Sequence, residues 1–192
     1  PIAADMSDLE KVEQNFDGIT YAKGASVLKL LVSFVGRDAF FAGVGAYFAK
    51  HAWGNTQLSD LLVELEAASG RDLSWFSSEW LETAGVNTLA ADVEVDDEGR
   101  FTRFAVAQSA HPDWPTLRTH RLGIGLYDLS EDGTLGRREY VEADVAGPLT
   151  EIPQLVGQRR GDLVLLNDGD LTYAKIHLYA DSRAVLAEHF GG

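Results

Sequence analysis

The spacing of apolar residues changes near residue 88, and this change most constrains the fold of the 192-residue chain. Before it, apolar residues recur every three or four positions, as on one face of an α-helix. After it, apolar and polar residues alternate, as in a half-buried β-strand. We therefore predict a multi-domain α + β protein, with a helical unit over residues 1–88 and a small antiparallel β-sandwich over residues 89–178.

Four short helices are predicted in the later part of the first unit. The helical spacing runs from Ala22 to Val35, and Gly36 is a typical stop signal. The next helices are expected to begin at Asp38, at Asn55 or Thr56, and at Asp72, the last of them ending at Gly85. On the second helix, five apolar residues are expected on one side: Phe40, Phe41, Val44, Tyr47 and Phe48.

Three β-hairpins are predicted in the second unit. Turn residues separate paired alternating segments at positions 96–99, 131–133 and 168–169. Three hairpins at this spacing favour a β-sandwich. Within a strand, Gly123 and Gly125 indicate a close approach of another backbone segment. Residues 181–190 return to helical spacing, so residues 179–192 are expected to start a further helical domain that the chain does not complete.

Composition excludes several classes of function. Lys plus Arg number 16 and Asp plus Glu 30, a formal net charge of −14. Nucleic acids and anionic membrane surfaces attract basic faces, so neither is an expected partner. The chain has no cysteine, which excludes disulfides, thiol catalysis and cysteine-ligated zinc. No apolar run is long enough to span a bilayer, and no signal segment opens the chain. We expect a cytoplasmic protein.

The histidines do not predict a metal site. Five are present, and no two are separated by the four positions that place two imidazoles on one helical face. The acidic turns do not match a calcium-binding loop. We therefore expect this chain to bind no metal and no cofactor. The five histidines are His51, His111, His120, His177 and His189.

Tyr21 is the residue with the strongest claim to chemistry. A tyrosine just before an apolar helix is commonly a core or half-buried aromatic. Here Gly18 and Gly24 flank it, and Thr20 can cap the helix that is predicted to follow. This arrangement would hold the phenol at a rigid helix entrance, as a preorganised catalytic donor requires.

The segment around Tyr21 resembles the F-D-x-I-x-Y-x-K-G-A motif of zinc aminopeptidases of the aminopeptidase N family. It reads Phe16-Asp17-Gly18-Ile19-Thr20-Tyr21-Ala22-Lys23-Gly24-Ala25. Further segments resemble the same family in order and spacing, up to residue 88. Residues 89–178 are similar to the β-sandwich that follows, and residues 170–175 to an actinobacterial version. The further segments are Pro1-Ile2, residues 35–41, 47–51, 55–56, 69–73 and 80–85.

The resemblance implies zinc-dependent removal of N-terminal amino acids from peptides, with zinc and a glutamate activating water. It implies that Tyr21 stabilises the tetrahedral oxyanion, whereas Lys23 and Gly24 are structural. The family's H-E-x-x-H zinc helix is missing, so the zinc ligands and the base are expected upstream of residue 1, and the chain alone is expected to be inactive. Phe16 stands where some relatives carry a second tyrosine, and Val86-Asn87 departs from a common x-Pro.

Two other functions are compatible with the sequence. The helices and the sandwich could form an interaction scaffold without catalysis. Alternatively, the sandwich could bind carbohydrate, with Trp114 and Tyr127 as an aromatic platform. If the chain is part of an enzyme, Tyr21, Phe16 and Ile19 are expected near an exposed apolar patch. Weak self-association through this patch is then expected, opposed by the negative charge.

Overall fold

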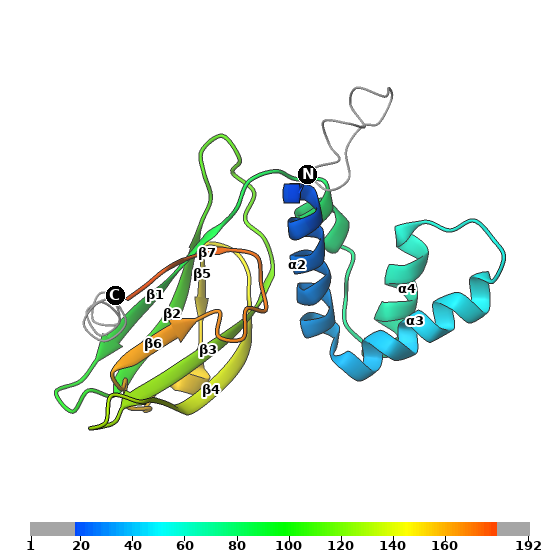
Figure 1. Ribbon diagram of the computed structural model, residues 1–192. Coiled ribbons are helices and arrows are strands. Elements are labelled where there is room, and N and C mark those ends of the chain that lie inside the picture. The colour runs from blue at the N-terminus through cyan, green and yellow to red at the C-terminus, as the bar shows by residue number, and fades with distance from the viewer. Residues whose placement is uncertain (1–17, 180–192) are drawn as a thin grey trace. The chain divides into compact units, whose positions relative to one another are not determined.

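The computed structural model describes residues 18–179 and divides the chain into two compact units, Pro1–Thr83 and Ala84–Gly192. Figure 1 shows helices in the first unit and β-sheets in the second. Each unit is described by itself. The helix expected over residues 181–190 lies outside the described residues, and Tyr179 alone of the expected third domain (179–192) lies within them.

Within residues 18–83, the first unit contains three α-helices and one π-helical turn. Gly36, with φ of 87°, separates the first two helices, as the sequence predicted. Gly70 ends the third in the left-handed conformation that glycine adopts without steric cost. Gln57 caps the same helix in a capping box with Asp60, which moves its start past Asn55 and Thr56. The elements are α2 (Gly18–Val35), α3 (Arg37–His51), α4 (Leu58–Ser69) and η1 (Ser77–Leu81).

The fourth predicted helix is wrong in its extent. Turns and the single π-helical turn η1 replace a helix from Asp72 to Gly85. The Leu73 amide donates to the Glu66 carboxylate, and the Ser74 amide donates to the Asp72 carboxylate. Such side-chain acceptors compete with the backbone bonds of a helix. The apolar spacing still marks the core correctly, because Leu73, Phe76 and Trp80 are all buried.

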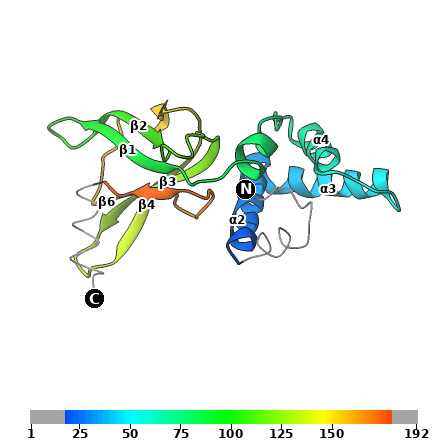
Figure 2. The same cartoon turned by 90° about the horizontal axis from the view of Figure 1, so that it is seen from above.

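Helices α3 and α4 lie side by side (Figures 1 and 2) and meet at Gly43. A Cβ atom on Gly43 would lie 2.8 Å from Leu65 Cδ2 and 3.0 Å from the Glu64 carbonyl oxygen. This close approach turns the opposite face of α3 outward. Phe41 and Phe48 are therefore exposed, whereas Phe40, Val44 and Tyr47, which the sequence placed on the same side, are half-buried.

The second unit contains two sheets whose apolar side chains form one core. The four-stranded sheet has the order β5-β2-β1-β7, and the three-stranded sheet has the order β4-β3-β6. Leu89 and Phe104 from the first sheet and Ile124 from the second are fully buried in this core. The strands are β1 (Thr88–Val95), β2 (Phe101–Ser109), β3 (His120–Leu129), β4 (Leu135–Val145), β5 (Leu149–Glu151), β6 (Leu163–Leu166) and β7 (Lys175–His177), with a 3₁₀ turn at Pro153–Leu155.

Two of the three predicted hairpins are confirmed, and the third is wrong. Strands β1 and β2 pair antiparallel, as do β3 and β4. In contrast, β6 pairs with β3, whereas β7 pairs parallel to β1 in the other sheet. The cause is the loop between them, in which Asn167 and Asp170 have positive φ and the Asn167 side chain bonds both backbone groups of Thr172. The four-stranded sheet is therefore mixed, not purely antiparallel.

The predicted close approach of another backbone segment is confirmed at Gly123, whereas the nearest atoms at Gly125 belong to side chains. A Cβ atom on Gly123 would lie 2.2 Å from the Asp168 carbonyl oxygen, and one on Gly125 would lie 2.3 Å from Asp168 Oδ2. Asp168 itself is buried, and its Oδ2 accepts hydrogen bonds from the Tyr127 hydroxyl (2.8 Å) and Arg137 Nη1 (3.2 Å). The missing side chains on β3 thus make room for the turn that leaves this sheet.

A buried polar group lies at one end of the β unit. Gln108 Nε2 donates to the carbonyl oxygens of Arg118 and Gly147, which orients its amide. Gln108 Oε1 is then an acceptor for His120 Nε2 at 3.0 Å, and His120 Nδ1 accepts from the Thr172 hydroxyl at 2.7 Å. His120 is therefore neutral with its proton on Nε2. Burial, together with the nearby Arg118 charge, lowers the pKa of His120 to about 3.

Among residues 18–179, no helix combines the length and the apolar composition that crossing a membrane requires.

The contact at Gly43 predicts opposite effects for two glycines of the same helix. Gly43→Ala should destabilise the helical unit by about 1–2 kcal/mol, since the new methyl group overlaps Leu65. The matched control Gly45→Ala should stabilise the unit by up to about 1 kcal/mol, because a Cβ there meets no atom within 4 Å and alanine favours the helix. Urea unfolding followed by circular dichroism measures both. Equal effects of the two changes would contradict the close approach.

Because His120 is buried in its neutral form, we predict that the β unit loses stability in mild acid. The unfolded chain binds this proton near pH 6.5, but the folded chain binds it only near pH 3. Stability is therefore complete above pH 6.5 and falls as the pH drops towards 3. Between pH 7 and pH 5, the free energy of unfolding of the β unit should fall by about 2 kcal/mol.

Denaturant unfolding of residues 1–192 at several pH values tests this. His120→Gln should flatten the pH dependence of the free energy of unfolding. His111→Gln, the control at an exposed position, should leave that pH dependence unchanged. A His120 ring that titrates near pH 6.5 in nuclear magnetic resonance spectra would contradict the prediction.

Candidate functional site

Tyr21 lies in the first described turn of α2, and its side chain is 61% exposed. The predicted helix entrance is displaced, because α2 already includes Gly18 and Thr20. Thr20 is therefore within the helix, and Tyr21 is a helical residue. Ala22, Ala25 and Leu28 are exposed as well. The phenol thus projects from an outward, largely apolar side of the helix.

The opposite side of α2 forms the core of the helical unit. Val27, Leu30 and Phe34 are buried at spacings of three and four residues. Lys23 occupies the first position of this buried stripe, four residues before Val27, and is itself buried. Its ammonium donates to the carbonyl oxygen of Thr83 at 3.1 Å, sixty residues away in the sequence. The helix that carries Tyr21 is therefore held by apolar contacts and by a directional, charge-assisted bond from Lys23.

The Lys23 bond joins two of the segments on which the family resemblance rests. Lys23 belongs to the tyrosine motif, and Thr83 belongs to the later Trp80–Gly85 segment. The sequence assigned Lys23 only a structural place and did not identify its partner. A signal was available in the sequence, because Lys23 falls on the apolar stripe of the helix, where a charged residue needs a partner.

The described residues do not assemble a metal centre. Across residues 18–179, histidine and acidic side chains do not gather into a group of three or more that could hold a metal ion. His51 lies at the end of α3, whereas His111, His120 and His177 belong to the β unit. His189 lies outside the described residues. Both ring nitrogens of the buried His120 are hydrogen-bonded, one to Gln108 and the other to Thr172, which leaves neither nitrogen open to a metal.

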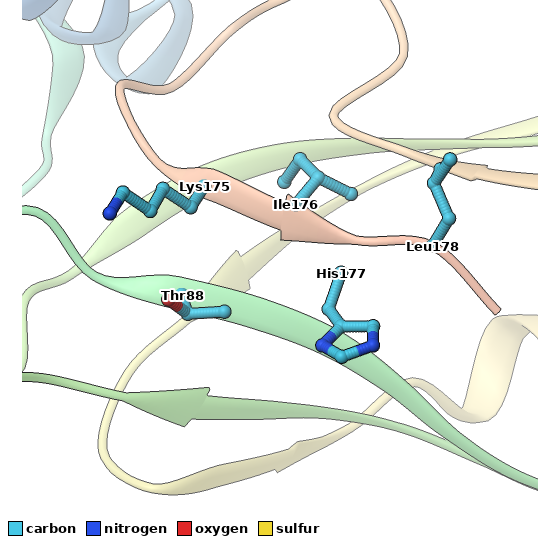
Figure 3. A pocket seen from close by; sticks show the side chains of 5 residues that line it. All are labelled: Thr88, Lys175, Ile176, His177 and Leu178. Carbon is cyan, nitrogen blue, oxygen red and sulfur yellow. The ribbon is translucent and has the colours of Figure 1, made fainter.

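A hollow of about 300 Å³ lies beside β7, at the edge of the four-stranded sheet. Figure 3 shows the side chains that line it, which come from β7, from the residue that follows β7 and from the start of β1. Thr88 and Lys175 are register partners there, and the exposed His177 lies two residues further along β7. The lining combines one hydroxyl, one ammonium and one imidazole with two apolar side chains: Thr88, Lys175, His177, Ile176 and Leu178.

A second hollow, of about 230 Å³, lies at the end of α3 and is mostly aromatic. It is lined in part by Tyr47, Phe48 and Trp53, and Trp53 is fully exposed with a φ of 66°. Phe48 and Trp53 are exposed there, whereas Tyr47 is half-buried. Phe16 and the Ile19 side chain, which the sequence placed beside Tyr21, lie outside what the structure describes.

The two aromatic residues considered as a carbohydrate platform have separate surroundings. Trp114 is 53% exposed and lies against Gly85, where an added Cβ would come within 2.6 Å of Trp114 Cβ. Tyr127 is half-buried and donates its hydroxyl proton to Asp168. Its polar end is thus engaged within the unit, which disfavours the platform.

Comparison with known proteins points to one family. Residues 1–80 match the Peptidase family M1 domain. Aminopeptidase N of Streptomyces lividans is 57% identical over 197 aligned residues, which cover all of this chain and 23% of that protein. The Tricorn protease-interacting factor F2 of Thermoplasma volcanium is 33% identical over 60% of this chain and 15% of that protein. The chain therefore spans less than a quarter of these relatives' length.

The fold has a counterpart among solved structures. Legionella pneumophila aminopeptidase A, solved in complex with aspartic acid, superposes with a TM-score of 0.60 over 93% of this chain and 20% of its own. At 17% identity, this similarity concerns the fold alone. Three findings agree with the motifs around Tyr21 and Trp80: the family match, the relative that aligns over the whole chain, and the shared fold. The chain therefore belongs to the aminopeptidase N family of M1 peptidases and is similar to the actinobacterial form.

Proposed function

We propose that this chain is part of a zinc-dependent aminopeptidase that removes N-terminal amino acids from peptides, and that Tyr21 is its oxyanion-binding residue. The observation that carries the proposal is the location of Tyr21. It occupies the tyrosine position of the family motif and projects outward from a helix whose opposite side is buried in the core. A phenol held in this way is a preorganised hydrogen-bond donor.

The role of the phenol follows from its chemistry. When water attacks a scissile carbonyl, negative charge develops on the carbonyl oxygen. A neutral phenol can donate its proton in a hydrogen bond to that oxygen, and the bond strengthens as the charge grows. Ala22, Ala25 and Leu28, which are exposed on the same side of α2, carry apolar side chains.

Zinc would supply Lewis-acid activation of the water and the carbonyl in such an enzyme. The described residues do not provide a ligand set for it. We propose that the zinc ligands and the general base belong to other parts of the full-length polypeptide, and that residues 1–192 alone are inactive. The proposed substrate is a peptide, and the proposed compartment is the cytoplasm. Weak self-association through the apolar side of α2 stays a prediction.

Tyr21→Phe should lower kcat of the full-length enzyme by about 100-fold or more and change KM much less. Loss of the phenol removes a bond made mainly in the transition state, which lowers kcat selectively. The control is Tyr47→Phe, which removes a phenol of the same helical unit that is bonded to Thr56. That variant should keep kcat within about two-fold. Near-normal kcat for Tyr21→Phe would reduce Tyr21 to a structural aromatic.

The isolated chain should hold no stoichiometric zinc after dialysis at neutral pH, because a tight site needs several converging ligands. Elemental analysis of residues 1–192, with the full-length enzyme as the positive control, measures this. One firmly held zinc per isolated chain would refute the proposed location of the ligands.

A further inference from the structure

We propose that Lys23 is a positioning residue for Tyr21. Its bond to the Thr83 carbonyl oxygen sets the rotation of the first turns of α2, and this rotation sets the location of the phenol. The inference rests on the proposed function of Tyr21 and extends it to a second residue of the same motif.

The burial of Lys23 is the first observation. Its side chain is 9% exposed, and its ammonium lies 3.1 Å from the Thr83 carbonyl oxygen. Lysine is rarely buried unless its charge has partners, because an unpaired ammonium is costly away from water. A methionine or leucine at this position would complete the apolar stripe without that cost. The lysine thus provides something that an apolar side chain cannot.

The Lys23 hydrogen bond contributes a preferred orientation of α2, which apolar contacts do not provide. Val27, Leu30 and Phe34 hold α2 by apolar burial, which is proportional to area and has no preferred angle. A hydrogen bond weakens steeply when its angle departs from linear. Lys23 stands at the N-terminal end of the buried stripe, in the turns of a helix that open most readily. A directional bond there restrains the rotation that apolar contacts leave loose.

The geometry of a helix connects this restraint to Tyr21. Two residues correspond to about 200° around the axis, so Lys23 and Tyr21 lie on opposite sides of α2. A side-chain end lies about 6 Å or more from the axis, and a rotation of about 10° therefore moves it by about 1 Å. A misplacement of about 1 Å can cost a factor of about 100 in rate.

The other end of the bond is itself held in place. The Thr83 hydroxyl donates to the Glu79 carbonyl oxygen, which belongs to η1. Trp80, in the middle of that π-helical turn, is 1% exposed and packed in the core. The carbonyl that receives Lys23 is therefore attached to a buried part of the same unit. An acceptor restrained in this way meets the requirement that supporting residues be locked themselves.

The test uses the full-length enzyme and a double-mutant cycle. Lys23→Met keeps an unbranched side chain of similar size but removes the donor. It should lower kcat by about 10-fold and leave KM within about two-fold, since only the transition-state contact is displaced. Lys23→Arg keeps a cationic donor and should recover most of kcat. Lys29→Met removes the same charge from an exposed position of α2 and should leave kcat unchanged.

The cycle separates positioning from general damage. If Lys23 acts through the phenol, Lys23→Met should cause no further loss of kcat in a Tyr21→Phe background, because coupled residues are not additive. An equal loss in both backgrounds, or normal kcat for Lys23→Met, would overturn the proposal. If Lys23→Met does not fold, Lys23→Leu, which also lacks a donor, takes its place in the same cycle with the same expectation.

The failure of this inference is distinguishable from the failure of the proposed function. Reduced kcat for Tyr21→Phe with normal kcat for Lys23→Met would overturn the role of Lys23 alone. Normal kcat for Tyr21→Phe would overturn the role of Tyr21 and, with it, the positioning role of Lys23.

Discussion

The buried side of α2 is the constraint on which the arrangement of the helical unit depends. Val27, Leu30 and Phe34 bring this side into the core, and Lys23 adds a directional bond to Thr83 at its N-terminal end. Because residues two positions apart lie on nearly opposite sides of a helix, burial of Lys23 obliges Tyr21 to face outward. The exposure of the tyrosine is thus a consequence of core packing and not a separate feature of the surface.

The β unit is organised by a different constraint, the passage of the chain from one sheet to the other. The turn at Asp168 crosses β3 where Gly123 and Gly125 leave no side chain in its path. The Asn167 side chain then bonds Thr172, whose hydroxyl in turn donates to His120 in the buried polar group. These contacts satisfy polar groups that burial would otherwise make costly. The polar residues of this unit therefore serve its stability.

The family assignment gives these two units a context that neither supplies alone. The chain aligns over its whole length with an aminopeptidase N and covers 23% of that protein. The chemistry proposed for the full-length enzyme needs a metal and a base as well as an oxyanion donor. Among the described residues, no group of three or more histidine or acidic side chains could hold the metal, and Tyr21 is the proposed donor. The formal net charge of −14 would also favour the approach of a peptide's cationic amino end.

The sequence by itself determined the division into a helical and a β unit, the turn positions and the candidate residue Tyr21. It did so because helical and strand periodicity and glycine stop signals are local properties, and because the motif around Tyr21 is contiguous. Only the tertiary structure decided the partner of β7, the extent of η1 and the partner of Lys23. Each of these depends on a contact that periodicity does not reveal: β7 with β1, Leu73 with Glu66, and Lys23 with Thr83. Periodicity states which side of an element is apolar, but it does not state which distant carbonyl or strand that side will meet.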